Sequence, residues 1–330
     1  MKNLGFWRSD SVPGLTVALP PGRHPVPEEN AVRSYAGSAQ RALGRYQLEQ
    51  ELGRGATGIV YRGRDPQTGR VVAIKTVARS RELEAGELQE VSERFIREAE
   101  TARRLNHPNL VRIFEAGEAH DLAYIAMEFL QGTDLAPYTR PDNLLPLPQV
   151  MRIIARVAAA LHHAHVNRVV HRDIKPSNIM YEPASGAVKV TDFGIACLTD
   201  SSRTGTGRVP GTPSYMSPEQ LAGKEIEGRS DLFSLGVTFY QLVAGHFPFP
   251  GDSLPQRVLR IANEPHADIL TYNPKLPPCL AGIINKALAK HPAGRYQTGD
   301  EMAQAIEACA DTMRDSRSRR EWRAAFVGAV

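Results

Sequence analysis

The pattern of apolar residues changes near Gly132, and this change restricts the folds that the chain can adopt. Before it, short segments rich in Val, Ile and Tyr are separated by turn residues, which is typical of strands. The predicted strands are residues 45–52, 57–64, 70–77 and 122–129. A charged helix ending near Leu105 interrupts them. We therefore expect a small, mostly β, N-terminal lobe.

After Gly132 the periodicity is helical. Apolar residues from Val150 to Leu161 recur at intervals of three and four, which places them on one helix face. Leu232–Val243 is almost wholly apolar, follows Asp231, and is predicted as a buried helix. Further helices are predicted at 255–263, 278–290 and 298–309. The expected fold is α+β with two lobes, about 46–130 and about 131–309.

The two ends differ from this central region. Residues 1–45 are rich in Pro, Gly, Ser and Ala and predict a flexible tail or linker, and 310–330 predict a basic tail. Apolar residues make up 42% of the chain and charged residues 23%, as in soluble proteins. Because we find no secretory leader and no membrane-spanning run, we expect a cytoplasmic protein.

Charge and cysteine content exclude other classes. A net charge of +4 is too small to suggest nucleic-acid binding by itself, so no nucleic-acid partner is expected. The three cysteines, Cys197, Cys279 and Cys309, are odd in number and widely spaced. They argue against a disulfide framework and favour a reducing compartment.

A glycine-rich loop joins the first two predicted strands. Gly53, Gly55 and Gly58 form a G-x-G-x-x-G pattern, with Arg54 inside it, and glycines let backbone amides approach phosphate groups. The same pattern occurs in dinucleotide-binding proteins, but there a helix follows directly. Here a strand follows, which favours a phosphate-binding loop between strands.

The segment from His171 to Gly194 contains the groups that phosphoryl transfer requires. It contains His-Arg-Asp-Ile-Lys-Pro-Ser-Asn and, after a predicted strand, Asp-Phe-Gly. Asp173 would orient the attacking hydroxyl and accept its proton, and Lys175 would neutralise the γ-phosphate. Asn178 and Asp192 would be magnesium ligands. An isolated Asp or Asn in a loop is ordinarily a turn residue, but here the whole set occurs in order.

Lys75 ends the apolar segment Val72–Lys75. In isolation it could be an edge lysine, but it could also bind the α and β phosphates if a carboxylate held it. Glu98 on the following helix is the best candidate for that carboxylate, with Glu93 and Glu100 as alternatives.

From about Tyr46 to Cys309 the sequence resembles the eukaryotic-type (Hanks-type) serine/threonine protein kinases, most closely those of bacteria. Residues 211–219 occupy the position of the substrate loop, and Arg295 is the expected partner of Glu219. Ser217 replaces the alanine that is usual before Pro-Glu. The resemblance implies the bilobal protein-kinase fold, with ATP in its cleft and Mg²⁺ or Mn²⁺ as the metal.

The resemblance also implies which residues contact ATP. Met127 corresponds to the gatekeeper, and Glu128 to Leu130 to the hinge that binds adenine. Val60, Ala73 and Met180 would enclose the base, and Asp134 would reach the ribose. Lys175 together with Thr212 in the substrate loop indicates serine/threonine specificity rather than tyrosine specificity.

Regulation follows from the charge of Arg172, directly before Asp173. In the kinases that this sequence resembles, such an arginine is commonly neutralised by a phosphate group on the activation segment. We predict autophosphorylation of Thr204 and Thr206 during transient homodimer formation; the alternative is that residues 201–207 are only a polar loop.

Other hypotheses for the function of the chain are a nucleotide-binding scaffold and a small-molecule phosphotransferase. The complete catalytic set argues against the first and the substrate loop against the second.

Two further features have ordinary explanations. His162, His163 and His165 lack a Cys or carboxylate at ligand spacing, so we do not predict a metal site, and Cys197 is predicted to be a packing residue. The arginine-rich C-terminus, with Trp322 on the same helical face as Phe326, could contact a membrane surface weakly. A frayed or packed tail is the alternative.

Overall fold

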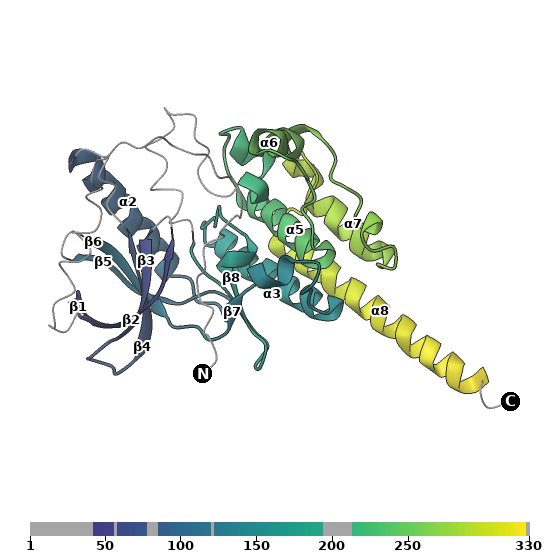
Figure 1. Cartoon of the computed structure of the whole chain (residues 1–330), viewed down its shortest axis with the longest axis horizontal. Coiled ribbons are helices and arrows are strands. Elements are labelled where there is room, and N and C mark those ends of the chain that lie inside the picture. Colours follow the sequence, from purple (N-terminus) through teal and green to yellow (C-terminus); the bar gives the residue numbers. More distant parts are fainter. Residues whose placement is uncertain (1–41, 56–57, 78–84, 120–121, 194–212, 328–330) are drawn as a thin grey trace, which may run out of the picture. The chain divides into compact units, whose positions relative to one another are not determined.

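The computed structural model describes residues 42–55, 58–77, 85–119, 122–193 and 213–327 of the 330-residue chain. The chain divides into two compact units (Figure 1). The first unit contains the described residues before 84 together with 113–129, and the second contains 84–112 and the residues from 130 onward. The helix that the sequence analysis assigned to the N-terminal lobe therefore belongs to the second unit.

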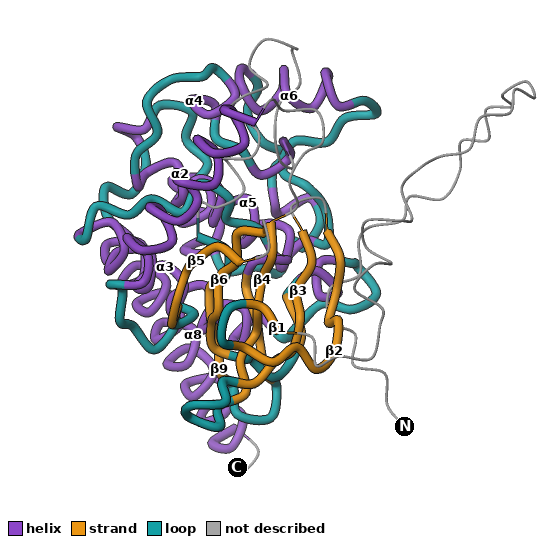
Figure 2. Tube along the Cα trace, turned by 90° about the vertical axis from the view of Figure 1, so that its left-hand side faces the viewer, coloured by secondary structure: helices purple, strands orange, loops and turns teal. Residues whose placement is uncertain are grey.

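The first unit is an antiparallel sheet with the strand order β1-β2-β3-β4-β6-β5 (Figure 2). The strands are β1 (Ala42–Leu43), β2 (Tyr46–Gly55), β3 (Gly58–Arg64), β4 (Val71–Val77), β5 (Ile113–Ala119) and β6 (Leu122–Glu128). The predicted strands correspond to β2, β3, β4 and β6, with bounds shifted by up to three residues. Valine, isoleucine and tyrosine in these segments suit a pleated, half-buried surface.

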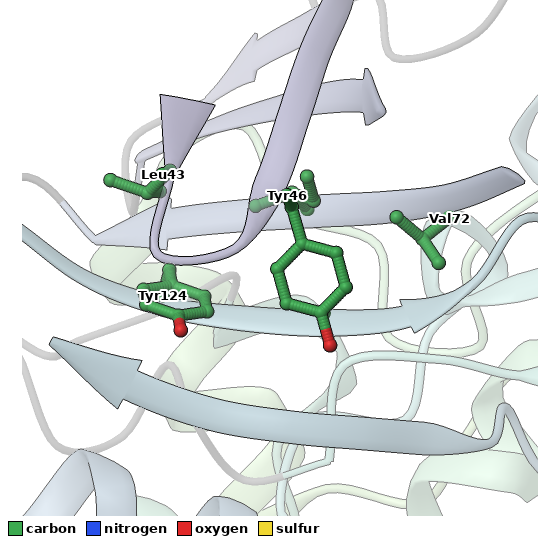
Figure 3. Close-up of a cluster of buried hydrophobic side chains, with 6 residues drawn as sticks. Leu43, Tyr46, Val72 and Tyr124 are labelled. Atoms are coloured by element: carbon green, nitrogen blue, oxygen red, sulfur yellow. The ribbon is translucent and has the colours of Figure 1, made fainter. Parts of the chain in front are cut away.

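One face of this sheet forms the hydrophobic core of the first unit (Figure 3). Leu43, Tyr46 and Val72 pack with Tyr124, and all four are buried. Because successive residues of a strand point to opposite faces, Ala73 and Lys75 lie on the other face of β4 from Val72. The sheet thus separates its core from the residues predicted to contact nucleotide.

The strands β1 and β5 were not predicted. Leu43 of β1 pairs with Tyr46, and Glu115 of β5 accepts hydrogen bonds from the hydroxyls of Tyr46, at 3.0 Å, and Tyr124, at 2.7 Å. Burial raises the pKa of Tyr46 to about 12, with the neighbouring Glu115 carboxylate adding to the effect. In β5 only Ile113 is buried, so the edge strand lacks the apolar alternation that marks the other strands.

The second unit is largely helical. Its α-helices are α2 (Ala85–Arg103), α3 (Leu147–Val166), α4 (Pro218–Leu221), α5 (Gly228–Ala244), α6 (Leu254–Asn263), α7 (Pro278–Ala287) and α8 (Gly299–Val327). A small sheet consists of β7 (Thr133–Asp134), β8 (Ile179–Glu182) and β9 (Ala187–Val190). Short 3₁₀ turns are η1 (Ala136–Thr139), η2 (Pro176–Asn178), η4 (Pro213–Tyr215), η5 (Ile269–Thr271) and η6 (Pro292–Gly294).

Helix α5 is the centre of this unit and packs against α3 and α7. Every residue from Ser230 to Ala244 is buried, as the apolar sequence predicted. The helix ends at Gly245, whose φ of +72° is a left-handed conformation that favours glycine. A fully buried helix gives the unit a rigid element to which loops can be anchored.

Two expectations about the C-terminal region are wrong. The helix predicted to end at Cys309 continues to Val327, and its last part projects past the other helices of the unit (Figure 1). Cys279 and Cys309 form a disulfide that joins α7 to α8, with a Cα–Cα distance of 5.8 Å. Sequence spacing did not reveal this pair, because 30 positions separate the cysteines and only helix packing brings them together.

Candidate active site

Residues 171–178 of the second unit, which we call the catalytic loop, hold Asp173 by one of its carboxylate oxygens. Oδ2 is 2.9 Å from Nζ of Lys175 and accepts a hydrogen bond of 3.0 Å from Nδ2 of Asn178. Nδ2 of Asn178 also donates to the backbone carbonyl of Asp173 at 2.7 Å. For Oδ1 of Asp173, the described residues supply no hydrogen-bond partner. The loop therefore fixes the carboxylate and leaves one oxygen as an acceptor.

His171 connects this loop to the segment before Asp192. Its ring is fully buried, accepts from the backbone N–H of Asp173 through Nδ1 at 3.2 Å, and donates through Nε2 to the carbonyl of Thr191 at 2.8 Å. Thr191 also donates its backbone N–H to the carbonyl of Asn178 at 2.9 Å. Hydrogen bonds thus join the motif that contains Asp173 and Asn178 to Thr191, the residue before Asp192.

Asp231 at the start of α5 holds the backbone of the catalytic loop. Oδ2 accepts from the N–H of His171 at 2.8 Å, and Oδ1 accepts from the N–H of Arg172 at 2.7 Å. These bonds stabilise Arg172 at a φ of +67°, an uncommon conformation for a residue with a side chain. His165 donates to Oδ2 at 2.8 Å, so this histidine supports the loop.

The predicted pair of Glu219 and Arg295 is confirmed. Nη1 and Nη2 of Arg295 donate to Oε1 and Oε2 of Glu219 at 2.6 and 2.8 Å, and Ser230 Oγ donates to Oε1 at 2.6 Å. Burial would raise the pKa of Glu219, but the hydrogen bonds from Arg295 and Ser230 outweigh it and lower the pKa to about 2. The pair joins α4, which begins at the end of the predicted substrate loop, to the turn before α8.

Arg172 has a second partner in α2. Its Nη1 is 3.7 Å from Oε1 of Glu98, and both side chains are about one third exposed. Its Nε is buried without an acceptor among the described residues, whereas its carbonyl accepts from Nε2 of Gln220 at 2.8 Å. Glu98, which we expected to bind Lys75, is thus close to the arginine of the catalytic loop.

Residues predicted to contact nucleotide share one face of the first unit's sheet. Val60 pairs with Lys75 across β3 and β4, and Ala73 pairs with Met127 across β4 and β6. Paired residues project to the same face, and so do Ala73 and Lys75 two positions apart. Lys75 is only 5% exposed. The strand register therefore groups a buried cation with three apolar side chains.

The remaining residues of the predicted nucleotide site are at strand ends. Gly53, Arg54, Gly55 and Gly58 lie where β2 and β3 meet, and Gly58 has a φ of +144°. Glu128 ends β6, and Leu130 follows it as a partly exposed residue of the second unit. In the second unit Asp134 of β7 pairs with Met180 of β8, and its Oδ1 accepts from the N–H of Ala136 at 2.8 Å.

Thr204, Thr206, Thr212 and Cys197 lie outside the described residues. After these residues the turn η4 begins at Pro213, and both Pro213 and Ser214 are buried.

Two supporting residues, His165 and Gln220, were missed by sequence reasoning, and Asp231 was noted only as the residue that precedes the buried helix. A signal was present for Asp231, because a carboxylate opening an apolar, buried helix requires hydrogen-bond donors. For His165 and Gln220 we find no comparable signal, since their partners are far away in the sequence.

Comparison with known proteins agrees with this geometry. The protein kinase domain family matches residues 46–309. The serine/threonine-protein kinase PrkC of Bacillus subtilis is 37% identical over 281 residues, which cover 85% of this chain and 43% of PrkC. PknB of Mycobacterium leprae is 40% identical over 266 residues, covering 78% and 42%. The chain therefore spans under half the length of these relatives.

Among solved structures, the kinase domain of Mycobacterium tuberculosis PknI superposes with a TM-score of 0.67 at 29% identity, covering 82% of this chain and 99% of that domain. The predicted fold is confirmed by this likeness, and the predicted enzyme class, a serine/threonine protein kinase, is confirmed at the level of the domain. The chain belongs to the protein kinase family and is similar to its bacterial serine/threonine members.

Proposed function

We propose that the chain transfers the γ-phosphoryl group of ATP to serine or threonine hydroxyls of proteins. The observation that supports this proposal is the hydrogen bonding of the Asp173 carboxylate. Lys175 and Asn178 both contact Oδ2, so Oδ1 is the oxygen that can accept the proton of a substrate hydroxyl. The hydroxyl oxygen then attacks the γ-phosphorus, the bond to the β-phosphate oxygen breaks, and ADP leaves.

Asn178 and Asp192 would hold the magnesium or manganese ion. The amide nitrogen of Asn178 donates to Asp173, so its carbonyl oxygen is the atom available to a cation. An amide oxygen and a carboxylate suit a hard divalent cation. When bound, the ion supplies positive charge to the phosphates.

The nucleotide contacts are proposed from strand register. Lys75 would bind the α and β phosphates, with Val60, Ala73 and Met180 against the base and Asp134 at the ribose. The buried, shared face of Val60, Ala73, Lys75 and Met127 supports this assignment.

The test is phosphoryl transfer from labelled ATP to a general protein substrate by the parent and by Asp173→Asn. We expect a loss of about 10²–10⁴ in kcat, because the acceptor of the proton is removed. Asp142→Asn is the matched control, since that carboxylate is 77% exposed and belongs to a surface pair. A parent that binds ATP but transfers no label would favour the scaffold hypothesis, and an active Asp173→Asn would exclude the role of Asp173.

We propose that autophosphorylation of Thr204 and Thr206 regulates the chain through Arg172. A phosphate is a stronger partner for a guanidinium than the carboxylate 3.7 Å away, so it would draw Arg172 from Glu98. Phosphopeptide mapping should find both sites in the parent and neither in Asp173→Asn. Label confined to other residues would contradict this proposal.

We also propose where the chain acts and what it contacts. In the part of the chain that the structure describes, no helix combines the length and apolar character needed to cross a bilayer. We propose a cytoplasmic kinase that forms a transient homodimer during autophosphorylation, and a weak surface contact of the basic end of α8 with anionic lipid. Sedimentation of the full chain with phosphatidylserine vesicles, against neutral vesicles, tests the last point.

A further inference from the structure

An arginine of α6 is bound directly to the substrate-loop region. Nη1 of Arg257 donates to Oγ of Ser214 in η4 at 2.8 Å, and its Nη2 donates to the carbonyl of Gly251 at 3.2 Å. The guanidinium also lies over the ring of Phe247, 5.2 Å from its centroid. The side chain is thus held in one place from three sides, although part of it stays exposed.

The positive charge of Arg257 is not neutralised by a carboxylate anywhere in the described residues. Its neighbour Arg260 differs, because Nε of Arg260 is 3.4 Å from Oε2 of Glu264. Nε of Arg257 is buried and lacks an acceptor within the described part of the chain. A fixed guanidinium with unused donors is a favourable site for an anion.

Apolar surface accompanies this charge. Tyr215 and Phe247 pack edge to face with their ring centroids 5.5 Å apart, and the Tyr215 hydroxyl donates to Oε1 of Gln241 at 2.5 Å. Tyr215, Met216 and Phe247 are partly exposed, and Leu254 at the start of α6 is 51% exposed. The arginine therefore borders an apolar surface to which Tyr215 and Met216 of the predicted substrate loop contribute.

We propose that Arg257 is a specificity-determining residue that binds the carboxylate of an acidic side chain near the acceptor of the substrate peptide. The proposal rests on the function proposed above. The two hydrogen bonds of Arg257 need only neutral N–H donors, so anchoring η4 does not account for the charge. An apolar side chain beside the acidic one would pack on Tyr215 and Phe247, which gives the site an orientation as well as a charge.

The experiment compares synthetic peptides that carry one threonine in a neutral background, with Glu or Gln at each flanking position in turn. For the parent we expect kcat/KM to be about tenfold higher for Glu than for Gln at one or more positions, equivalent to about 1.4 kcal/mol. Arg257→Gln keeps a donor for Ser214 but removes the charge, and it should reduce the ratio to about one. Arg260→Gln is the matched control and should preserve the ratio.

Peptide binding to the full chain, followed by fluorescence anisotropy, separates this proposal from the proposed function. If the parent transfers no phosphate but still binds the Glu peptide more tightly, and Arg257→Gln does not, the subsite stands without the kinase activity. Equal rates and equal binding for Glu and Gln peptides would overturn the proposal, as would a preference that survives in Arg257→Gln. A circular-dichroism spectrum and a melting temperature equal to those of the parent verify that Arg257→Gln is folded.

Discussion

Two Arg–Glu ion pairs of the second unit have the same chemistry but different surroundings. Arg295 and Glu219 are 0% and 9% exposed and joined by two hydrogen bonds, and Arg295 also donates to the carbonyls of Ala289, Arg229 and Lys290. Arg172 and Glu98 are 38% and 33% exposed, and their nearest atoms are 3.7 Å apart. The first pair is buried with its donors satisfied, and the second is loose and accessible to water.

This difference in burial indicates that the two pairs have different roles. The buried pair is a permanent part of the fold, which we call a framework pair, and the exposed pair is a contact that can be exchanged. Breaking a buried pair leaves a charge without solvent, which is costly, so the pair persists in every folded state. An exposed pair contributes little and can be replaced by a better partner. The same side-chain types can therefore fix α4 to the turn before α8 and leave Arg172 available to a phosphate.

The largest expected effect is that of Arg295→Met. It leaves Glu219 buried without its partner, so we expect the free energy of unfolding to fall by about 3–5 kcal/mol in urea titrations. The control is Arg314→Met, because Arg314 pairs with Asp311 at the surface, where both side chains are more than 60% exposed. A loss below 1 kcal/mol for Arg295→Met would mean that the buried pair is not the framework.

Removing the disulfide between Cys279 and Cys309 tests how much of the stability of this unit comes from a covalent link. It joins α7 to α8 across 30 residues, and a loop of this length predicts a stabilisation of about 2–4 kcal/mol. Cys279→Ser should show this loss under non-reducing conditions and no further change on adding reductant. If reductant lowers the melting temperature of the parent and of Cys279→Ser equally, the disulfide does not contribute.

The buried pair should also make the stability of the chain depend on pH. The pKa of Glu219 is about 2 in the folded chain and near 4.5 when unfolded, so its stabilisation is complete above 4.5 and is lost as the pH falls toward 2. Melting temperatures recorded over this range should fall more steeply for the parent than for Glu219→Gln. The control Glu264→Gln, at a 53% exposed carboxylate, should follow the parent.

The parts of the site that sequence could predict lie within short motifs. Asp173, Lys175 and Asn178 belong to one loop, so their spacing alone brought them within hydrogen-bond distance. Alternation within a strand indicates that Ala73 and Lys75 share a face, but the pairing of Val60 with Lys75 became evident only from the structure. The apolar pattern located α3 and α5. Burial of one face of a helix requires apolar residues at intervals of three and four, and burial of the whole helix requires an apolar segment.

The parts that could not be predicted depend on packing between distant segments. Asp231 binds the loop 59 and 60 positions earlier, and Cys279 meets Cys309 only because α7 packs on α8. The edge strand β5 lacks a buried stripe, and β1 is too short for any pattern. The contact of Glu98 with Arg172, 74 positions later in the chain, depends on where α2 packs, and the assignment of Glu98 to Lys75 stays a prediction.

The smallest expected effect is that of Glu98→Gln on stability. In a background of Asp173→Asn, which keeps the chain unphosphorylated, we expect the free energy of unfolding to change by no more than about 1 kcal/mol. A double-mutant cycle with Arg172→Gln isolates the pair itself, and its coupling energy should be near zero to 0.5 kcal/mol, as for exposed pairs.

This cycle measures the coupling free energy between Arg172 and Glu98, which a phosphate must exceed in order to draw Arg172 away from Glu98. A coupling of this size is smaller than that of a charge-assisted, bidentate phosphate contact, so Arg172 would change partners once the activation segment is phosphorylated. A coupling above 2 kcal/mol would instead make the contact with Glu98 a second framework pair. In that case phosphorylation could not release Glu98, and the contrast between the two ion pairs would disappear.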